Sequence, residues 1–129
     1  MKIFLLSTFT CVFLASCSSS TSLSDSSTNQ STDSAYGFSE KKPIKVGGGE
    51  GGPISERKYL NSLSGLNGES VTYNRIGSCC FFKSNSSPMG GGLLDKYAVS
   101  YEGKKDTVVL YLNRYEKGKL LAPVGFKMK

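Results

Sequence analysis

The sequence predicts an α+β fold in which one N-terminal helix packs on a small antiparallel sheet of about four strands. Residues 53–63 are the one stretch with an apolar stripe at helical spacing, whereas the stretches after residue 69 alternate or run apolar as strands do. The residues before 53 form an apolar leader and then a tract poor in core-forming side chains. Residues 53–129 are therefore expected to fold as one small domain.

Residues 1–16 predict a lipoprotein signal peptide. Lys2 supplies the positive charge, and Ile3 to Leu14 form an apolar run of about 12 residues, too short for the ~20 residues that span a membrane. The small residues Ala15 and Ser16 precede Cys17, which resembles the lipobox of bacterial lipoproteins. By this resemblance Cys17 is acylated and anchors the mature chain in a membrane. The alternatives are a signal peptide cleaved without lipidation and a buried N-terminal element with a free thiol.

Residues 17–52 predict the lipidated cysteine and a flexible tether rich in Ser, Thr and Gly. Residues 18–35 contain a single large aliphatic side chain, Leu23, and cannot bury enough surface to offset the entropy of ordering. Residues 36–46 have a weak extended pattern broken by Pro43, and either dock on the domain as an edge strand or stay loose. The glycines of 47–52 satisfy G-x-G-x-x-G but lack a surrounding βαβ unit, so they predict a hinge.

Residues 53–63 predict the only helix. Ser55 is placed to cap the first turn, Glu56 lies near the positive end of the helix dipole, and Gly65 suits the position that follows the helix. One face of the helix carries an apolar stripe that we expect to cover the sheet. The stripe consists of Tyr59, Leu60 and Leu63.

Four later stretches predict strands, namely 70–76, 97–101, 107–115 and 120–127. In the second, Tyr97, Val99 and Tyr101 share one face. Residues 107–115 are apolar on both faces for part of their length, which predicts a central position in the sheet. Pro123 predicts that the last stretch is an edge strand or is broken.

The double cysteine is the most suggestive chemical feature, and it falls in the loop predicted between residues 76 and 97. Three interpretations stay open for Cys79 and Cys80: a vicinal disulfide in an oxidising compartment, ligands for a soft metal, or small buried hydrophobes, including pairing with another chain. Two sulfurs and no histidine fall short of a zinc site, so we expect no metal. Neighbouring aromatic residues and glycines predict a partner-binding surface, formed by Cys79, Cys80, Phe81, Phe82, Gly90, Gly91 and Gly92.

Catalytic patterns are missing from the sequence, and the charge is basic. Without histidine there is no Ser-His or Cys-His pair, and the carboxylates fall mainly at predicted turns, so we expect neither an enzyme nor a cofactor. The net charge of +6 is concentrated in residues 53–129. It favours anionic surfaces such as lipid headgroups or acidic glycans, or else serves solubility alone. No nucleic-acid-binding motif is present.

Four segments together resemble a family of small lipoproteins from the Bacteroidetes: 55–69, 77–83, 92–97 and 123–126. The segment with Cys79 and Cys80 is the most specific, although the family usually has proline where this chain has Phe81. Family members are often labelled 2-dehydro-3-deoxyphosphooctonate aldolase. Such aldolases resemble (β/α)₈ barrels of ~250 residues, which residues 53–129 cannot build. The resemblance therefore implies a place in the bacterial cell envelope and no activity. Ser18 after the cysteine favours the outer membrane by analogy with sorting rules elsewhere.

These observations predict a membrane-anchored envelope lipoprotein whose domain is a non-catalytic binding or accessory module for an envelope protein. One alternative is a thiol-redox enzyme acting through Cys79 and Cys80, although these lack Cys-X-X-Cys spacing. Another alternative is a surface module that binds acidic glycan. Binding that weakens as salt is added would indicate such a module.

Overall fold

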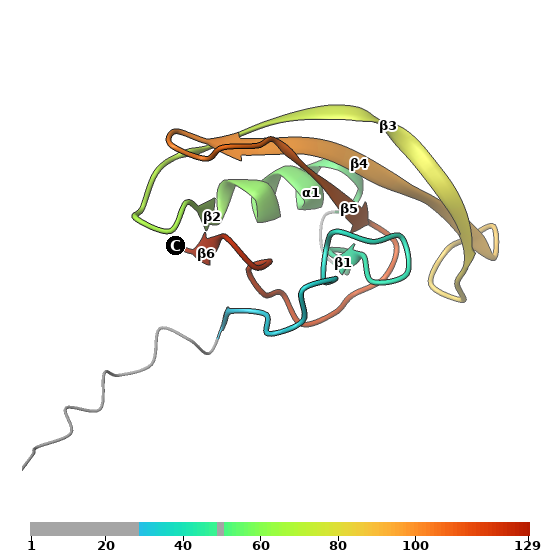
Figure 1. The fold of residues 1–129 in the computed structure, drawn as a ribbon. Coiled ribbons are helices and arrows are strands. Elements are labelled where there is room, and N and C mark those ends of the chain that lie inside the picture. Colours follow the sequence, from blue (N-terminus) through green and yellow to red (C-terminus); the bar gives the residue numbers. More distant parts are fainter. Residues whose placement is uncertain (1–28, 49–50) are drawn as a thin grey trace, which may run out of the picture.

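A four-stranded sheet lies over a single helix in the computed structural model, which describes residues 29–48 and 51–129 (Figure 1). The strand order is β1-β5-β4-β3, with strands Ile44–Lys45, Val108–Asn113, Gly91–Tyr101 and Val71–Lys83. A second sheet pairs β2, Leu63–Ser64, with β6, Lys127–Met128. The α+β class, the single helix and the four-stranded sheet are confirmed. The sheet is mixed, however, because β1 runs parallel to β5.

The helix α1, Gly52–Asn61, begins and ends earlier than predicted. Gly51 occupies the N-cap position without a side-chain hydrogen bond, and Pro53 lies in the first turn, where its missing N–H is tolerated. Ser55 therefore lies inside the helix and does not cap it. Ser62 is the C-cap, and Gly65 follows β2 and does not end the helix.

The hydrophobic core lies between α1 and one face of the sheet. Tyr59 and Leu60 of the helix are buried there as predicted, and Leu63 is buried from β2. From the sheet, the core receives the side chains of Tyr97, Val99, Leu110 and Leu112. The predicted shared face of Tyr97 and Val99 and the central position of β5 are confirmed.

Residues 29–48 pack on the domain, in contrast to the tether that the sequence predicts for 17–52. The N–H of Ser31 donates to the carbonyl of Ala122 at 2.9 Å, and β1 pairs with β5 through Ile44 opposite Leu112. Ile44 is fully buried. Isolated apolar residues in a polar stretch are buried here because the sheet offers them an unpaired edge. This arrangement is the edge-strand alternative that the sequence predicts for residues 36–46. The predicted signal peptide, Cys17 and positions 49–50 of the predicted hinge lie outside the described residues.

Strands β3 and β4 are longer than predicted, so the loop expected over residues 77–92 is wrong. They stay paired from Val71 opposite Tyr101 to Lys83 opposite Gly91, and residues 84–90 alone connect them. Register shifts at Ile76 and Cys80 place one extra residue each in β3. Each bulge reverses the alternation of inward-facing and outward-facing side chains. A strand prediction that depends on a period of two residues therefore misses this part of β3.

The last predicted strand, 120–127, is mostly irregular. Pro123 accepts a turn hydrogen bond from the N–H of Phe126 at 3.0 Å, and the strand β6 begins only at Lys127. The break predicted at Pro123 is thus confirmed. In the part of the chain that the structure describes, no helix is long and apolar enough to cross a membrane.

Candidate functional site

The β3–β4 hairpin extends beyond the rest of the sheet as a two-stranded arm. We define the arm as residues 77–94; it begins where β5 stops pairing with β4, at Asp95 (Figure 1). Three large apolar side chains on the arm face solvent, with exposed fractions of 68% for Phe81, 91% for Met89 and 48% for Leu93. Phe81 and Leu93 are cross-strand partners and therefore share one face.

A cleft of about 570 Å³ lies along this part of the arm and is called the arm cleft below. Of the predicted surface residues, Phe81, Gly91 and Gly92 line it, together with Ser78, Ser87, Pro88, Met89, Leu93, Arg114 and Tyr115. Phe82 instead packs against Tyr115, with ring centroids 5.9 Å apart. Cys79, Cys80 and Gly90 do not line the cleft. The structure thus brings part of the predicted set together and adds residues from the end of β5.

Gly91 and Gly92 lie in β4, and they permit close packing where the sequence suggested a flexible loop. A Cβ atom on Gly92 would overlap the ring of Tyr115, and one on Gly91 would overlap the carbonyl oxygen of Phe82. Tyr115 can therefore lie directly on β4 at the wall of the cleft.

The double cysteine forms the second bulge of β3. Cys79 pairs with Leu94, whereas Cys80 is the extra residue, and a disulfide joins the two cysteines. Cys80 has φ 65°, which among the described residues makes it the one non-glycine with positive φ. The bulge bends the arm next to the cleft. Oxidation of this pair in the cell stays a prediction.

An acidic cluster lies at the base of the arm, where Glu56 and Asp95 are both fully or almost fully buried. One oxygen of Asp95, Oδ1, accepts hydrogen bonds from Nη2 of Arg75 at 2.6 Å and from Oγ of Ser78 at 2.8 Å. The hydroxyl of Tyr97 donates to Oε2 of Glu56 at 2.7 Å. The second oxygen of each carboxyl group, Oε1 of Glu56 and Oδ2 of Asp95, is buried without a conventional partner.

The pKa values of the two buried carboxyl groups are shifted in opposite directions. Burial is the main cause that raises the pKa of Glu56 to about 7, and the neighbouring Asp95 contributes to the same rise. Burial opposes ionisation of Asp95 as well, but the neighbouring Glu56 and the hydrogen bonds from Arg75 and Ser78 outweigh it and hold the pKa of Asp95 below its usual range. The two shifts in opposite directions indicate that Glu56 is the protonated partner below about pH 7.

Arg114 connects this cluster to the arm cleft. It follows the last residue of β5, its Nε is 3.7 Å from Oδ2 of Asp95, and its side chain also lines the cleft. Its Nη2 lies 3.4 Å from the hydroxyl of Tyr115. The lining of the cleft therefore combines one partly exposed guanidinium group with several apolar side chains.

Sequence reasoning missed Glu56, Asp95 and Arg114, although two of them had a detectable signal. Glu56 precedes Leu60 by four residues, so it lies on the apolar stripe of the helix. Asp95 precedes Tyr97 by two, so it lies on the core face of β4. An acidic residue on an apolar face indicates a buried charge. Arg114 had no such signal.

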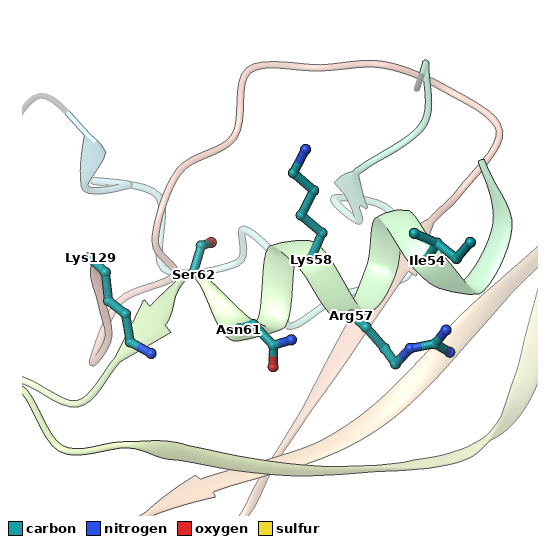
Figure 2. Close-up of a pocket in the computed structure, with 6 residues that line it drawn as sticks. All are labelled: Ile54, Arg57, Lys58, Asn61, Ser62 and Lys129. Carbon is teal, nitrogen blue, oxygen red and sulfur yellow. The ribbon is translucent and has the colours of Figure 1, made fainter. Parts of the chain in front are cut away.

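A second depression, on the exposed side of α1, carries three basic residues that do not converge. It is lined by Ile54, Arg57, Lys58, Asn61, Ser62 and Lys129. In Figure 2 Lys58 points to one side of the helix, whereas Arg57 points to the opposite side. Such an arrangement provides separated surface charges and no preformed site for an acidic group.

Among residues 29–48 and 51–129, no three Asp, Glu, Cys or His side chains come together as a metal site would require. Comparisons with family models, with curated proteins and with solved structures find no match for this chain.

Proposed function

We propose that this protein is a lipid-anchored lipoprotein of the bacterial envelope whose domain acts as a non-catalytic binding or accessory module. The arm is its working surface. The observation that carries the proposal is the exposure of Phe81, Met89 and Leu93 on one protruding hairpin. Large apolar side chains gathered on a surface and edged by polar groups are typical of interaction sites.

The direction of the arm supports a partner away from the anchor. In Figure 1 the described chain begins at the lower left, in blue, and the C-terminus also lies on the left, whereas the β3–β4 connection lies at the far right. The described chain therefore leaves the domain on the side opposite the arm, and an anchor attached before residue 29 would not have to cover the arm. An envelope protein is accordingly the partner that we propose.

The test is to extract the C-terminally tagged protein from native membranes in mild detergent and to identify by mass what accompanies it in stoichiometric amounts. The arm variant carries Phe81→Ser and Leu93→Ser. The matched control carries Ile54→Ser and Leu66→Ser, which remove side chains of similar exposure, 49% and 46%, elsewhere on the domain.

We expect the wild type and the control to retain the same envelope protein and the arm variant to lose it. Equal recovery with the arm variant, or no stoichiometric protein in any sample, would contradict the proposal.

A further inference from the structure

We propose that the arm cleft binds an acyl chain that ends in a carboxylate, with Arg114 holding the carboxylate and Phe81, Met89 and Leu93 contacting the chain. This inference goes beyond the proposed function, because it assigns to the arm cleft a small ligand of its own in addition to the protein partner proposed for the arm. It rests on the residues that line the cleft.

The guanidinium group of Arg114 has donors available for a ligand. Its Nε is 3.7 Å from Asp95, beyond hydrogen-bond distance, and its one hydrogen bond in the described chain is the long contact with Tyr115 at 3.4 Å. Asp95 is bound much more closely by Arg75, at 2.6 Å. Arg114 can therefore present two parallel N–H groups to a carboxylate, which is the geometry that arginine favours.

The apolar part of the cleft suits a flexible chain. Phe81 and Leu93 form one wall, and Met89, the most exposed apolar residue at 91%, lies at the connection of the hairpin. Methionine and aromatic side chains adapt to irregular apolar ligands. The volume of about 570 Å³ lies within the ~300–1,000 Å³ of ordinary small-molecule sites.

The polar lining favours an acyl chain over a peptide. A peptide would bring an N–H and a carbonyl for each residue, and each of these needs a partner once it leaves water. Apart from Arg114 and the Tyr115 hydroxyl, the polar side chains that line the cleft are Ser78 and Ser87. Ser78 already donates to Asp95, and Ser87 already donates to the carbonyl of Gly91. An alkyl chain makes no such demand, and its single charge matches the single arginine.

The test measures binding of decanoate, below its micelle-forming concentration, by calorimetry. The protein is the full chain carrying Cys17→Ala, so that it has no acyl chain of its own. The uncharged analogue is 1-decanol. Arg114→Gln removes the cation, Met89→Ser removes an apolar contact from a side chain too exposed to matter for folding, and Leu66→Ser is the control outside the cleft.

We expect saturable binding of one decanoate per chain, at least about tenfold weaker binding of decanol and of decanoate to Arg114→Gln, and a several-fold loss in Met89→Ser. Leu66→Ser should bind like the wild type. Equal affinity for decanol and decanoate, or wild-type affinity in both cleft variants, would overturn the inference. Those results would leave recovery of a protein partner unaffected, whereas failure to find a partner would contradict only the proposed function.

Discussion

Replacing Glu56 with glutamine is expected to abolish most of the pH dependence of stability between pH 5 and pH 8. The folded protein holds a proton on Glu56 up to about pH 7, whereas the ordinary pKa of the group is 4.5. Because the folded state binds this proton more tightly, stability is greatest below pH 4.5 and is lost as the pH rises through 7. The difference corresponds to about 3 kcal/mol of unfolding free energy. Asp95, with its lowered pKa, acts in the opposite direction and only at acid pH.

Glutamine at position 56 can still make hydrogen bonds, but its side chain does not ionise. Its amide oxygen can accept the hydrogen bond that the Tyr97 hydroxyl donates to Oε2 of Glu56, and its amide nitrogen is a donor, as a protonated carboxyl group is. The chain has no histidine, so no imidazole obscures the change between pH 5 and pH 8. The two carboxyl groups titrate together, and the measured midpoint belongs to the pair.

The assay is urea unfolding of both proteins from pH 5 to pH 8, with the disulfide kept oxidised in both. Wild-type stability should fall by about 3 kcal/mol across this range, while Glu56→Gln should stay nearly constant and become the more stable protein above pH 7. Glu102→Gln, at an exposed acid, should keep the wild-type slope. A flat wild-type profile, or the same slope in Glu56→Gln, would refute the raised pKa of Glu56.

Three further outcomes are expected. Gly92→Ala should lower the unfolding free energy by about 1–3 kcal/mol because its Cβ overlaps the Tyr115 ring, and adding Tyr115→Ser should recover most of that loss in urea unfolding. Serine at both Cys79 and Cys80 should weaken recovery of the partner from membranes. Serine at 79 with glycine at 80 should preserve recovery, since glycine adopts the positive φ of the bulge freely; equal recovery from both variants would count against a role for the bulge. Cys17→Ala should abolish incorporation of a labelled fatty acid into the protein, and labelling equal to that of the wild type would contradict lipid anchoring at Cys17.

The local pattern of the sequence determined the elements whose periodicity is intact. Tyr59 and Leu60 mark the buried face of α1, and Tyr97 and Val99 mark that of β4, because burial on one side leaves a repeat in the chain itself. The continuous apolar run in β5 likewise revealed its central place. The same rule failed in β3, where the bulges at Ile76 and Cys80 reverse the alternation.

Tertiary structure decided the features that depend on residues far apart in the chain. Ile44 is a core residue because β1 pairs with the edge of β5. Nothing near Ile44 in the sequence requires this pairing. The candidate site likewise needs three elements at once: Glu56 comes from the helix, Asp95 from β4, and Arg114 from the end of β5. A buried carboxyl pair and an arginine beside an apolar cleft arise only when packing brings these side chains together, because the free-energy terms involved depend on distance and burial in the folded state.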